Sequence, residues 1–305
     1  MSVFDRSYRK YEGELKGRMY KIWEIAKSTF RVQFSGKKVI LLLIFCNLPV
    51  LAFTLMLVFM AIFIPGGFSD IFLGTLFESL DLALYLIIMF SFNAGSIFMP
   101  TVFIAALNSG TIANDKKHNA LALYMAKPID RIDYGIGKFI SVLMVSSFVT
   151  YIPWFVFMVA FTLIGGVSGT EFVQSIWVFF AAMAGALVVM LFFGSITLLF
   201  SSMTSQSILG GILMILVIFL PSVIINSVNV IFEQDWLNYF SVSSLIASSI
   251  YVLFGKPSAG SLLGEAAGFF GFNVNGWVSL AILLLISAIA LLLTFRNLYK
   301  EDISG

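Results

Sequence analysis

Long apolar runs alternate with short polar segments along this chain of 305 residues. Five runs contain no Asp, Glu, Lys, Arg or His, and they cover residues 39–69, 82–114, 139–170, 172–232 and 266–295. A helix rises about 1.5 Å per residue and needs roughly 20 apolar residues to cross the hydrocarbon core of a bilayer. Each run is therefore long enough for at least one span, and the pattern predicts an all-α integral membrane protein.

Turn signals divide these runs into six expected spans. Pro65-Gly66-Gly67 and Gly165-Gly166 each close one run, and the polar segment 201–207 divides the long stretch 172–232. Gly and Pro interrupt helices because Pro lacks a backbone donor and Gly costs conformational entropy. We expect spans at about residues 39–64, 82–107, 136–164, 176–200, 208–231 and 277–295.

The serine-rich segment 236–255 could be a seventh span. In that case Arg296 and Lys300 would lie on the same side of the membrane as Glu233, Asp235 and Glu265. Positive charge concentrates in cytosolic loops, so this arrangement is unfavourable. We therefore expect a re-entrant or interfacial helical segment here, between spans 5 and 6.

Charge is concentrated at one side of the predicted membrane. Seventeen of the 18 Lys and Arg residues fall in residues 6–38, 116–138 and the last ten, whereas the other predicted loops are acidic. With 60% hydrophobic and 11% charged residues, the composition excludes a soluble globular protein. We expect a multi-pass protein of the plasma membrane with both termini in the cytosol. Its parts are a cytosolic segment 1–38, a transmembrane domain 39–295 and a tail 296–305.

The N-terminal segment contains a basic amphipathic helix at about residues 12–34. Apolar residues recur at helical spacing on one face, and cations occupy the rest. Such a helix lies in the plane of the lipid headgroups. It would anchor the chain there, and it could equally brace a cytosolic partner. The expected membrane-surface residues are Leu15, Met19, Ile22, Trp23 and Phe30.

A second cytosolic element lies between spans 2 and 3, at residues 108–138. Asn114 or Asp115 can cap a short helix that runs over residues 114–126, and Pro128 ends it. Asp130 then begins the next helix. A short helix bounded in this way is suited to be held by another protein.

This loop resembles the first cytosolic loop of type-2 ABC exporter permeases. The resemblance rests on an acid before the short helix, the Lys-Pro-Ile-Asp-Arg stretch after it and a Gly-Lys that opens the third span. The matching residues are Asp115, Pro128, Ile129, Arg131, Gly137 and Lys138. The sequence departs from the usual pattern of this family at three positions. It has Asp130 where Ser or Thr is commoner, Asp115 where Glu is commoner, and His118 where a small residue is commoner. The Leu-Tyr pair at residues 123–124 is similar to the branch that includes permeases of copper-enzyme maturation systems.

The resemblance implies a partner for the loop. In that family the short helix is the coupling helix, which docks on a separate ATPase subunit. The expected contacts are Asp115, Lys116, Lys117, His118, Leu121, Tyr124, Pro128 and Arg131. It also implies a second permease chain, as a homodimer or heterodimer. ATP and Mg would bind to the partner ATPase, and we expect no cofactor, metal or nucleic acid on this chain.

The apolar runs place few ionisable or reactive side chains in the membrane interior. Transporters that run on ion gradients place ionisable groups near the midplane, and we expect none within these spans. No Gly-x-x-x-x-Gly-Lys-Ser/Thr motif is present, so ATP hydrolysis is expected on a partner. The leading hypothesis is the non-enzymatic permease of an exporter whose substrate is amphipathic or lipid-like. The alternative is a membrane subunit that anchors or regulates a cytosolic enzyme without transport.

The orientation can be tested by thiol labelling in a Cys46→Ser background. Single cysteines at Ser69, Ser168 and Ser258 should react with an impermeant thiol reagent added outside intact cells, because these positions lie in the acidic loops. A cysteine at Asn119 should react only after the cells are opened. Labelling of position 119 in intact cells would reverse the predicted orientation.

Overall fold

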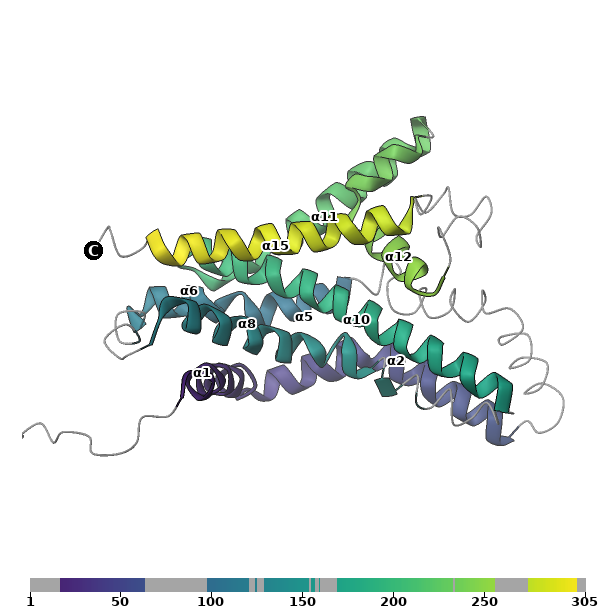
Figure 1. The fold of residues 1–305 in the computed structure, drawn as a ribbon, viewed down its shortest axis with the longest axis horizontal. Coiled ribbons are helices and arrows are strands. Elements are labelled where there is room, and N and C mark those ends of the chain that lie inside the picture. Colours follow the sequence, from purple (N-terminus) through teal and green to yellow (C-terminus); the bar gives the residue numbers. More distant parts are fainter. Residues whose placement is uncertain are drawn as a thin grey trace, which may run out of the picture.

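The computed structural model describes residues 17–63, 98–120, 124, 129–153, 155–156, 159, 169–232, 234–255 and 274–300. These residues form helices and turns, and no strand occurs among them (Figure 1), which confirms the predicted all-α class. The helices, labelled as in Figure 1, are α1 (Arg18–Gln33), α2 (Lys37–Phe63), α5 (Phe98–Asn108), α6 (Gly110–Lys117), α8 (Arg131–Ser147), α10 (Gly169–Met203), α11 (Ser207–Phe232), the 3-10 helix η1 (Asp235–Phe240), α12 (Val242–Leu253) and α15 (Gly276–Lys300).

Helix α10 lies at the centre of the fold and contacts α5, α6, α8, α11, α12 and α15. Its buried face carries Val189 and Phe193, which pack with Phe103 of α5, Met214 of α11 and Leu283 of α15. All five side chains are almost inaccessible. The helices therefore share one core that runs the length of the bundle.

Three described helices are long and apolar enough to cross a membrane: Phe179–Met203, Ser207–Ile225 and Gly276–Lys300. They fall on the predicted spans 4, 5 and 6. Helix α2 covers the first predicted span with 27 residues, and residues 82–97 of the second lie outside the described residues. The count of six spans stays a prediction.

Helix α10 and the third predicted span differ from expectation. Helix α10 begins at Gly169 and is 35 residues long, so it starts before the predicted residue 176. Helix α8 begins at Arg131 and ends at Ser147, and residues 148–150 form turns before helix resumes at residue 151. Pro153 explains this break, because its ring clashes with the carbonyl of the residue four positions earlier, Val149.

The expected absence of ionisable groups from the spans is wrong at Lys138. This residue lies inside the predicted span 136–164 and is only 3% exposed. The uncharged run begins one residue later, at Phe139, whereas the predicted span begins at residue 136 and therefore includes the lysine. Its charge must be compensated inside the protein.

The predicted helix over residues 114–126 is also corrected. Asn114 and Asp115 do not cap a helix, since both lie inside α6, which already begins at Gly110. Helix α6 ends at Lys117, and Asn119 has a positive φ of 52°, so one continuous helix is not formed. Asn is among the few residues that adopt this conformation readily. Leu121 and Pro128 lie outside the described residues.

Residues 236–255 do not form a seventh span. The 3-10 helix η1 is followed by α12, whose 12 residues cover about 18 Å, well short of the hydrocarbon core. Helix α12 packs against α15, α10 and α11 at the end of the bundle where α15 begins (Figure 1). Ser241 caps it by accepting a hydrogen bond from the backbone N–H of Ser244.

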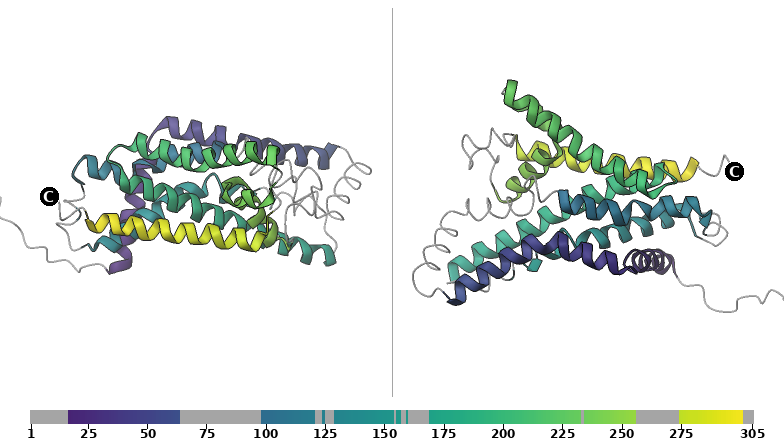
Figure 2. Two further views of the ribbon diagram at one scale, coloured as in Figure 1. Left: turned by 90° about the horizontal axis from the view of Figure 1, so that it is seen from above. Right: turned by 180° about the vertical axis from the view of Figure 1, so that it is seen from behind.

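Helix α1 crosses the other helices. Figure 1 shows it end-on while α10 and α15 run along the long axis, and the left view of Figure 2 shows it lying across them. It packs on α8 near the end of the molecule that holds α6 and the last turns of α15. We call this the basic end, because the described cations there are Arg18, Lys116, Lys117, Arg131, Lys138, Arg296 and Lys300.

Small residues allow close contacts between helices, as at Gly185 and Gly194 of α10. A Cβ atom built on Gly185 would lie 3.4 Å from Ile250 of α12, and one on Gly194 would lie 3.0 Å from Leu143 of α8. The tightest contact between α12 and α15 lies elsewhere. A Cβ on Gly276 would lie 2.5 Å from the carbonyl oxygen of Ser248 and 2.6 Å from Cβ of Val252.

Replacing Gly276 by alanine should therefore destabilise the protein. We expect Gly276→Ala to force α12 away from α15 and to lower the free energy of unfolding in detergent micelles by about 1–3 kcal/mol, the usual cost of overpacking. Gly185→Ala is the matched control, because it faces the same helix at an ordinary contact distance. Equal stability of the two variants would contradict the inferred close approach.

Candidate functional site at the start of helix α8

The first two turns of α8 bind three other helices at the basic end. Its sequence Arg-Ile-Asp-Tyr-Gly-Ile-Gly-Lys (residues 131–138) places charged, aromatic and small residues on several faces. Asp130 occupies the N-cap position with extended backbone, as expected, although its side chain makes no capping bond there. Asp133, in the first turn, has a favourable position near the positive end of the helix dipole.

A buried ion pair joins α8 to α6. Lys138 Nζ lies 2.7 Å from Asp115 Oδ2, with the two side chains 4% and 19% exposed. The Tyr134 hydroxyl donates to the same Oδ2 atom at 2.7 Å. Tyr134 and Lys138 are four residues apart and so share one face of α8. A charge buried here needs this partner, because desolvation of a lone ammonium or carboxylate is costly.

Two aromatic rings enclose the pair. Lys138 Nζ lies 5.4 Å from the centroid of the Tyr134 ring and 5.8 Å from that of Tyr124. The two rings are 5.3 Å apart. Burial raises the pKa of the Tyr124 phenol, and the Asp115 carboxylate adds to that shift. Tyr124 therefore remains neutral at physiological pH and closes the site from the loop side.

A second ion pair joins α8 to α1. Arg18 Nε donates to Asp133 Oδ1 at 2.6 Å, and Asp133 is almost fully buried whereas the Arg18 side chain is 60% exposed. The hydrogen bond with Asp133, and then the charge of that carboxylate, raise the pKa of Arg18. Gly137 lets α1 approach, because a Cβ atom there would lie 2.9 Å from Ile25 and 3.0 Å from the backbone of Ile22.

Gln33, at the last residue of α1, joins this helix to α5 and α6. Its Nε2 atom donates to the carbonyl oxygen of Leu107 (3.2 Å), to Asn108 Oδ1 (3.1 Å) and to Thr111 Oγ1 (2.8 Å). Its Oε1 atom accepts from the hydroxyl of Ser141 in α8 at 3.2 Å. One amide therefore connects α1 to three other helices, α5, α6 and α8, through directional bonds.

Helix α6 is also fixed to α10. The Ser201 hydroxyl oxygen accepts from the backbone N–H groups of Ile112 (2.8 Å) and Ala113 (3.1 Å). Lys116 Nζ donates to the carbonyl oxygen of Ser202. These bonds satisfy donors in the first turn of α6 that have no partner within the helix. Helix α6 is thus held on one side by α8 and on the other by α10.

Helix α15 meets the same region through its last turns. Arg131 donates to the carbonyl oxygen of Tyr299 at 3.3 Å and lies 5.5 Å from the centroid of that ring. Asn297 donates to the Ser202 hydroxyl at 3.2 Å. A Cβ atom on Gly135 would lie 2.5 Å from the Phe295 ring, so glycine is required for this close contact.

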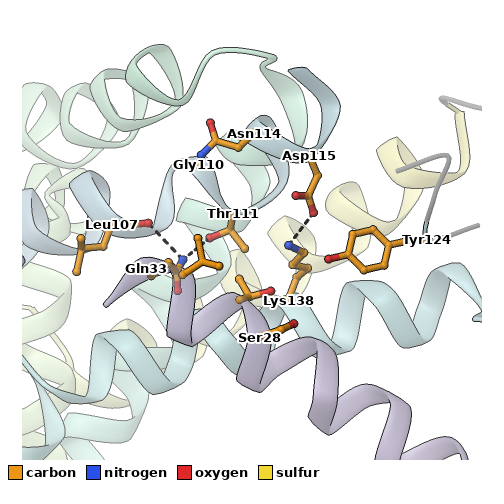
Figure 3. A pocket seen from close by; sticks show the side chains of 11 residues that line it. Ser28, Gln33, Leu107, Gly110, Thr111, Asn114, Asp115, Tyr124 and Lys138 are labelled. Atoms are coloured by element: carbon orange, nitrogen blue, oxygen red, sulfur yellow. Dashed lines mark hydrogen bonds and ion pairs between the residues drawn. The ribbon is translucent and has the colours of Figure 1, made fainter. Parts of the chain in front are cut away.

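A cleft of about 160 Å³ lies between α1, α6 and α8, beside the buried ion pair. Figure 3 shows Asp115 and Tyr124 directed at Lys138 on one side, and Gln33 with its bonds to Leu107 and Thr111 on the other. The cleft combines a charged pair with hydroxyl and amide groups. It can hold a small polar group without moving any of the helices described.

The structure divides the predicted coupling-helix residues into two sets. Asp115, Lys116 and Tyr124 point inward and make the contacts above, whereas Lys117 and His118 are exposed. The His118 ring Nδ1 bonds with the carbonyl oxygen of Asn114 at 2.8 Å, so it donates to an end carbonyl of α6. Arg131 contacts Tyr299 of α15.

The predicted membrane-surface residues are divided as well. Met19 and Trp23 are 78% and 51% exposed, whereas Ile22 is buried against α8 and Phe30 packs with Phe34 and Phe148. Leu15 lies outside the described residues. One part of the predicted apolar face of α1 therefore packs against the protein, and another part is exposed to the surroundings. The contacts of Gln33, Asp133 and Tyr134 were not predicted from the sequence. The spacing of four residues between Tyr134 and Lys138 was a signal that these two share a helix face.

A double-mutant cycle can measure the ion pair. Asp115→Asn or Lys138→Met alone should lower the free energy of unfolding in detergent micelles by about 3–5 kcal/mol, because each leaves a buried charge without its partner. The double variant should lose clearly less than the sum of the two, since no unpaired charge remains. Lys117→Met, an exposed cation on the same helix, is the control and should change stability by about 0.5 kcal/mol or less. Additive losses would contradict the pairing.

Comparison with known proteins identifies the family of this chain. A comparison with curated proteins found no match. The profile described as "ABC-2 family transporter protein" matches residues 23–303, which includes every element described above except the start of α1. The match covers most of α1, the α6–α8 region and the last helix, so it confirms the resemblance of the loop. The chain belongs to the ABC-2 family of transporter proteins, the membrane-embedded permeases of ABC transporters.

Proposed function

We propose that this chain is the permease subunit of an ATP-driven exporter, with both termini in the cytosol and the basic end facing an ATPase subunit. Two permease chains, identical or related, and two ATPase subunits would form the complex. ATP and Mg would be bound by the ATPase subunits. Family membership supports the permease role, and the concentration of cations at the basic end supports the orientation.

The observation that carries the proposal is the way α6 is fixed at the basic end. Its inward face is bonded to α8 through Asp115 and to α10 through Ser201, while Lys117, His118 and Asn119 are exposed at its far end. An ATPase that contacts the exposed end would therefore move α6 together with the two helices behind it. This is the property that a coupling element needs.

The docking contacts would lie on the exposed part of the loop. Lys117 and His118 would provide polar contacts, and Leu121, two residues after Asn119 in the sequence, would provide an apolar one. Asp115, Lys116, Tyr124 and Arg131 would act behind the interface by holding its shape. Pro128 would end the element before α8.

The substrate would be amphipathic or lipid-like. The polar side chains buried among α5, α10, α11 and α15 are hydroxyl and amide groups that bond to nearby backbone, such as Thr197 and Thr294. Lys138, the charged group found in a predicted span, is neutralised by Asp115. Neutral walls of this kind suit the transfer of an amphipathic molecule better than that of a small ion.

Helix α1 would hold the permease at the membrane surface. It lies across the other helices (Figure 1). Met19 and Trp23 remain exposed on it. Exposed aromatic and apolar residues beside cations are typical of helices in the headgroup region.

The docking role can be tested by co-purification of the ATPase subunit. Leu121→Asp should weaken the association a hundredfold or more, because a charge without a partner in a docking groove costs several kcal/mol. The variant should still insert into the membrane, and ATP-dependent movement of substrate in vesicles should be lost with it.

Leu121→Met is the matched control and should retain the ATPase. Undiminished association in Leu121→Asp would exclude this loop as the docking element. If Leu121→Asp and Leu121→Met both inserted into the membrane and bound the ATPase equally, another surface of the basic end would have to carry the coupling role.

A further inference from the structure

We propose that the cleft between α1, α6 and α8 binds the phosphoethanolamine headgroup of an aminophospholipid from the adjacent leaflet. The cleft is a built site rather than a packing fault, because one of its walls carries an unsatisfied polar group. Thr29 Oγ1 is buried and has no hydrogen-bond partner within the described part of the chain, although its residue is 8% exposed and lines the cleft. A hydroxyl in this position requires a ligand or ordered water.

The cleft offers donors on one side. Lys138 Nζ carries three N–H groups, of which Asp115 takes one. The Thr111 hydroxyl accepts from Gln33 and so retains its own hydrogen for donation. With Thr29, these groups provide three donors of the kind that phosphate oxygens accept.

An acceptor lies beside the Lys138 donor. Both bonds that the structure gives Asp115 end on Oδ2, from Lys138 and from Tyr134. The Oδ1 atom is therefore available to a primary ammonium group. Ser28, at the edge of the cleft, donates to the carbonyl oxygen of Ile25 and leaves its oxygen as a second acceptor.

The charge of the cleft selects the ligand class. The charges of Asp115 and Lys138 cancel, so a ligand with net charge would leave one uncompensated charge beside this largely buried ion pair. A zwitterion with a phosphate and a primary ammonium matches both members of the pair. A choline group carries no N–H donor for Asp115, so the site should discriminate against it.

Size and position indicate a lipid rather than a free metabolite. The volume of 160 Å³ corresponds to about five waters, which admits a headgroup but not acyl chains. Val32 lines the cleft and is 73% exposed. Its apolar side chain would contact the glycerol and acyl chains of the lipid where they extend out of the cleft. Helix α1, which forms this wall, also exposes Met19 and Trp23, as a helix at the headgroup level does.

The inference goes beyond the proposed function because it concerns the permease chain alone, and it holds whether or not an ATPase docks on the loop. The bound headgroup would connect α1 to α6 and α8 at the membrane surface. The lipid would thereby help to hold α1 in place, together with the bonds made by Gln33 and Arg18.

The test is native mass spectrometry of the full chain, released from nanodiscs with equal amounts of dioleoyl phosphatidylethanolamine, phosphatidylcholine and phosphatidylglycerol. We expect phosphatidylethanolamine to be retained about tenfold over the other two lipids, the ratio that one hydrogen bond to a charged group provides. Thr29→Val preserves the shape and should reduce this preference severalfold. Ser28→Phe should close the mouth and abolish it, and Ser227→Ala on α11 is the control.

Equal retention of the three lipids, a preference for phosphatidylglycerol, or an unchanged preference in both α1 variants would overturn the proposal. Soluble phosphoethanolamine provides the second arm and should not displace the lipid at equal concentration. Displacement by it would assign the cleft to a free zwitterion instead of a lipid. Unfolding temperatures of the variants should match that of the wild type, which separates loss of the ligand from loss of the fold.

Discussion

The buried pair between Lys138 and Asp115 is the constraint on which the basic end depends. Lys138 is only 3% exposed, so water cannot solvate its ammonium group. Asp115 must therefore lie within bonding distance, and this requirement fixes where α6 stands relative to α8. The Tyr134 hydroxyl bonds to the same carboxylate and limits its rotation. The register between the two helices is thus set by charge rather than by packing.

The remaining contacts at this end follow from the same register. Once α6 is placed, Ser201 of α10 can reach the free N–H groups of its first turn, and Gln33 of α1 can reach Thr111. Gly137 then decides how closely α1 approaches α8, and Gly135 does the same for α15. A larger residue at either position would separate the helices that carry the bonding groups. The two glycines are therefore as necessary as the charges.

Hydroxyl groups are used differently along the apolar part of the bundle. Ser195, Ser227, Ser287 and Thr294 each donate to the carbonyl oxygen four residues earlier in their own helix. Such bonds satisfy the hydroxyl without a second helix, so they do not specify which helices pair. Packing there is decided by shape, as at Gly185 and Gly276. The bundle thus combines a directionally bonded end with a part held mainly by close contact.

The sequence predicted the helical class and three of the apolar spans because hydrophobic length is a local property that needs no knowledge of contacts. It also located Asp115, Arg131 and Lys138 through the resemblance of the loop, but it could not say that Asp115 points inward. That orientation depends on α6 beginning at Gly110, where Ser109 occupies the N-cap position but its side chain makes no capping bond. The role of Gln33 was not predictable, because its partners lie 74 to 108 residues away in the chain. The break after Ser147 could have been placed from Pro153, since the ring excludes the carbonyl four residues before it.

The distribution of bond types has a mechanical consequence for the proposed coupling. A force applied to the exposed end of α6 meets ion pairs and several directional hydrogen bonds, which resist both sliding and rotation. Farther along the bundle the helices meet mainly through buried apolar side chains and close approaches at glycines, which permit small sliding movements of packed helices. The basic end would therefore move as one unit, and relative displacement would occur farther along the helices, between α10, α12 and α15. Transmission from an ATPase to the membrane needs this combination, since a loosely bonded α6 would absorb the motion before it reached the spans.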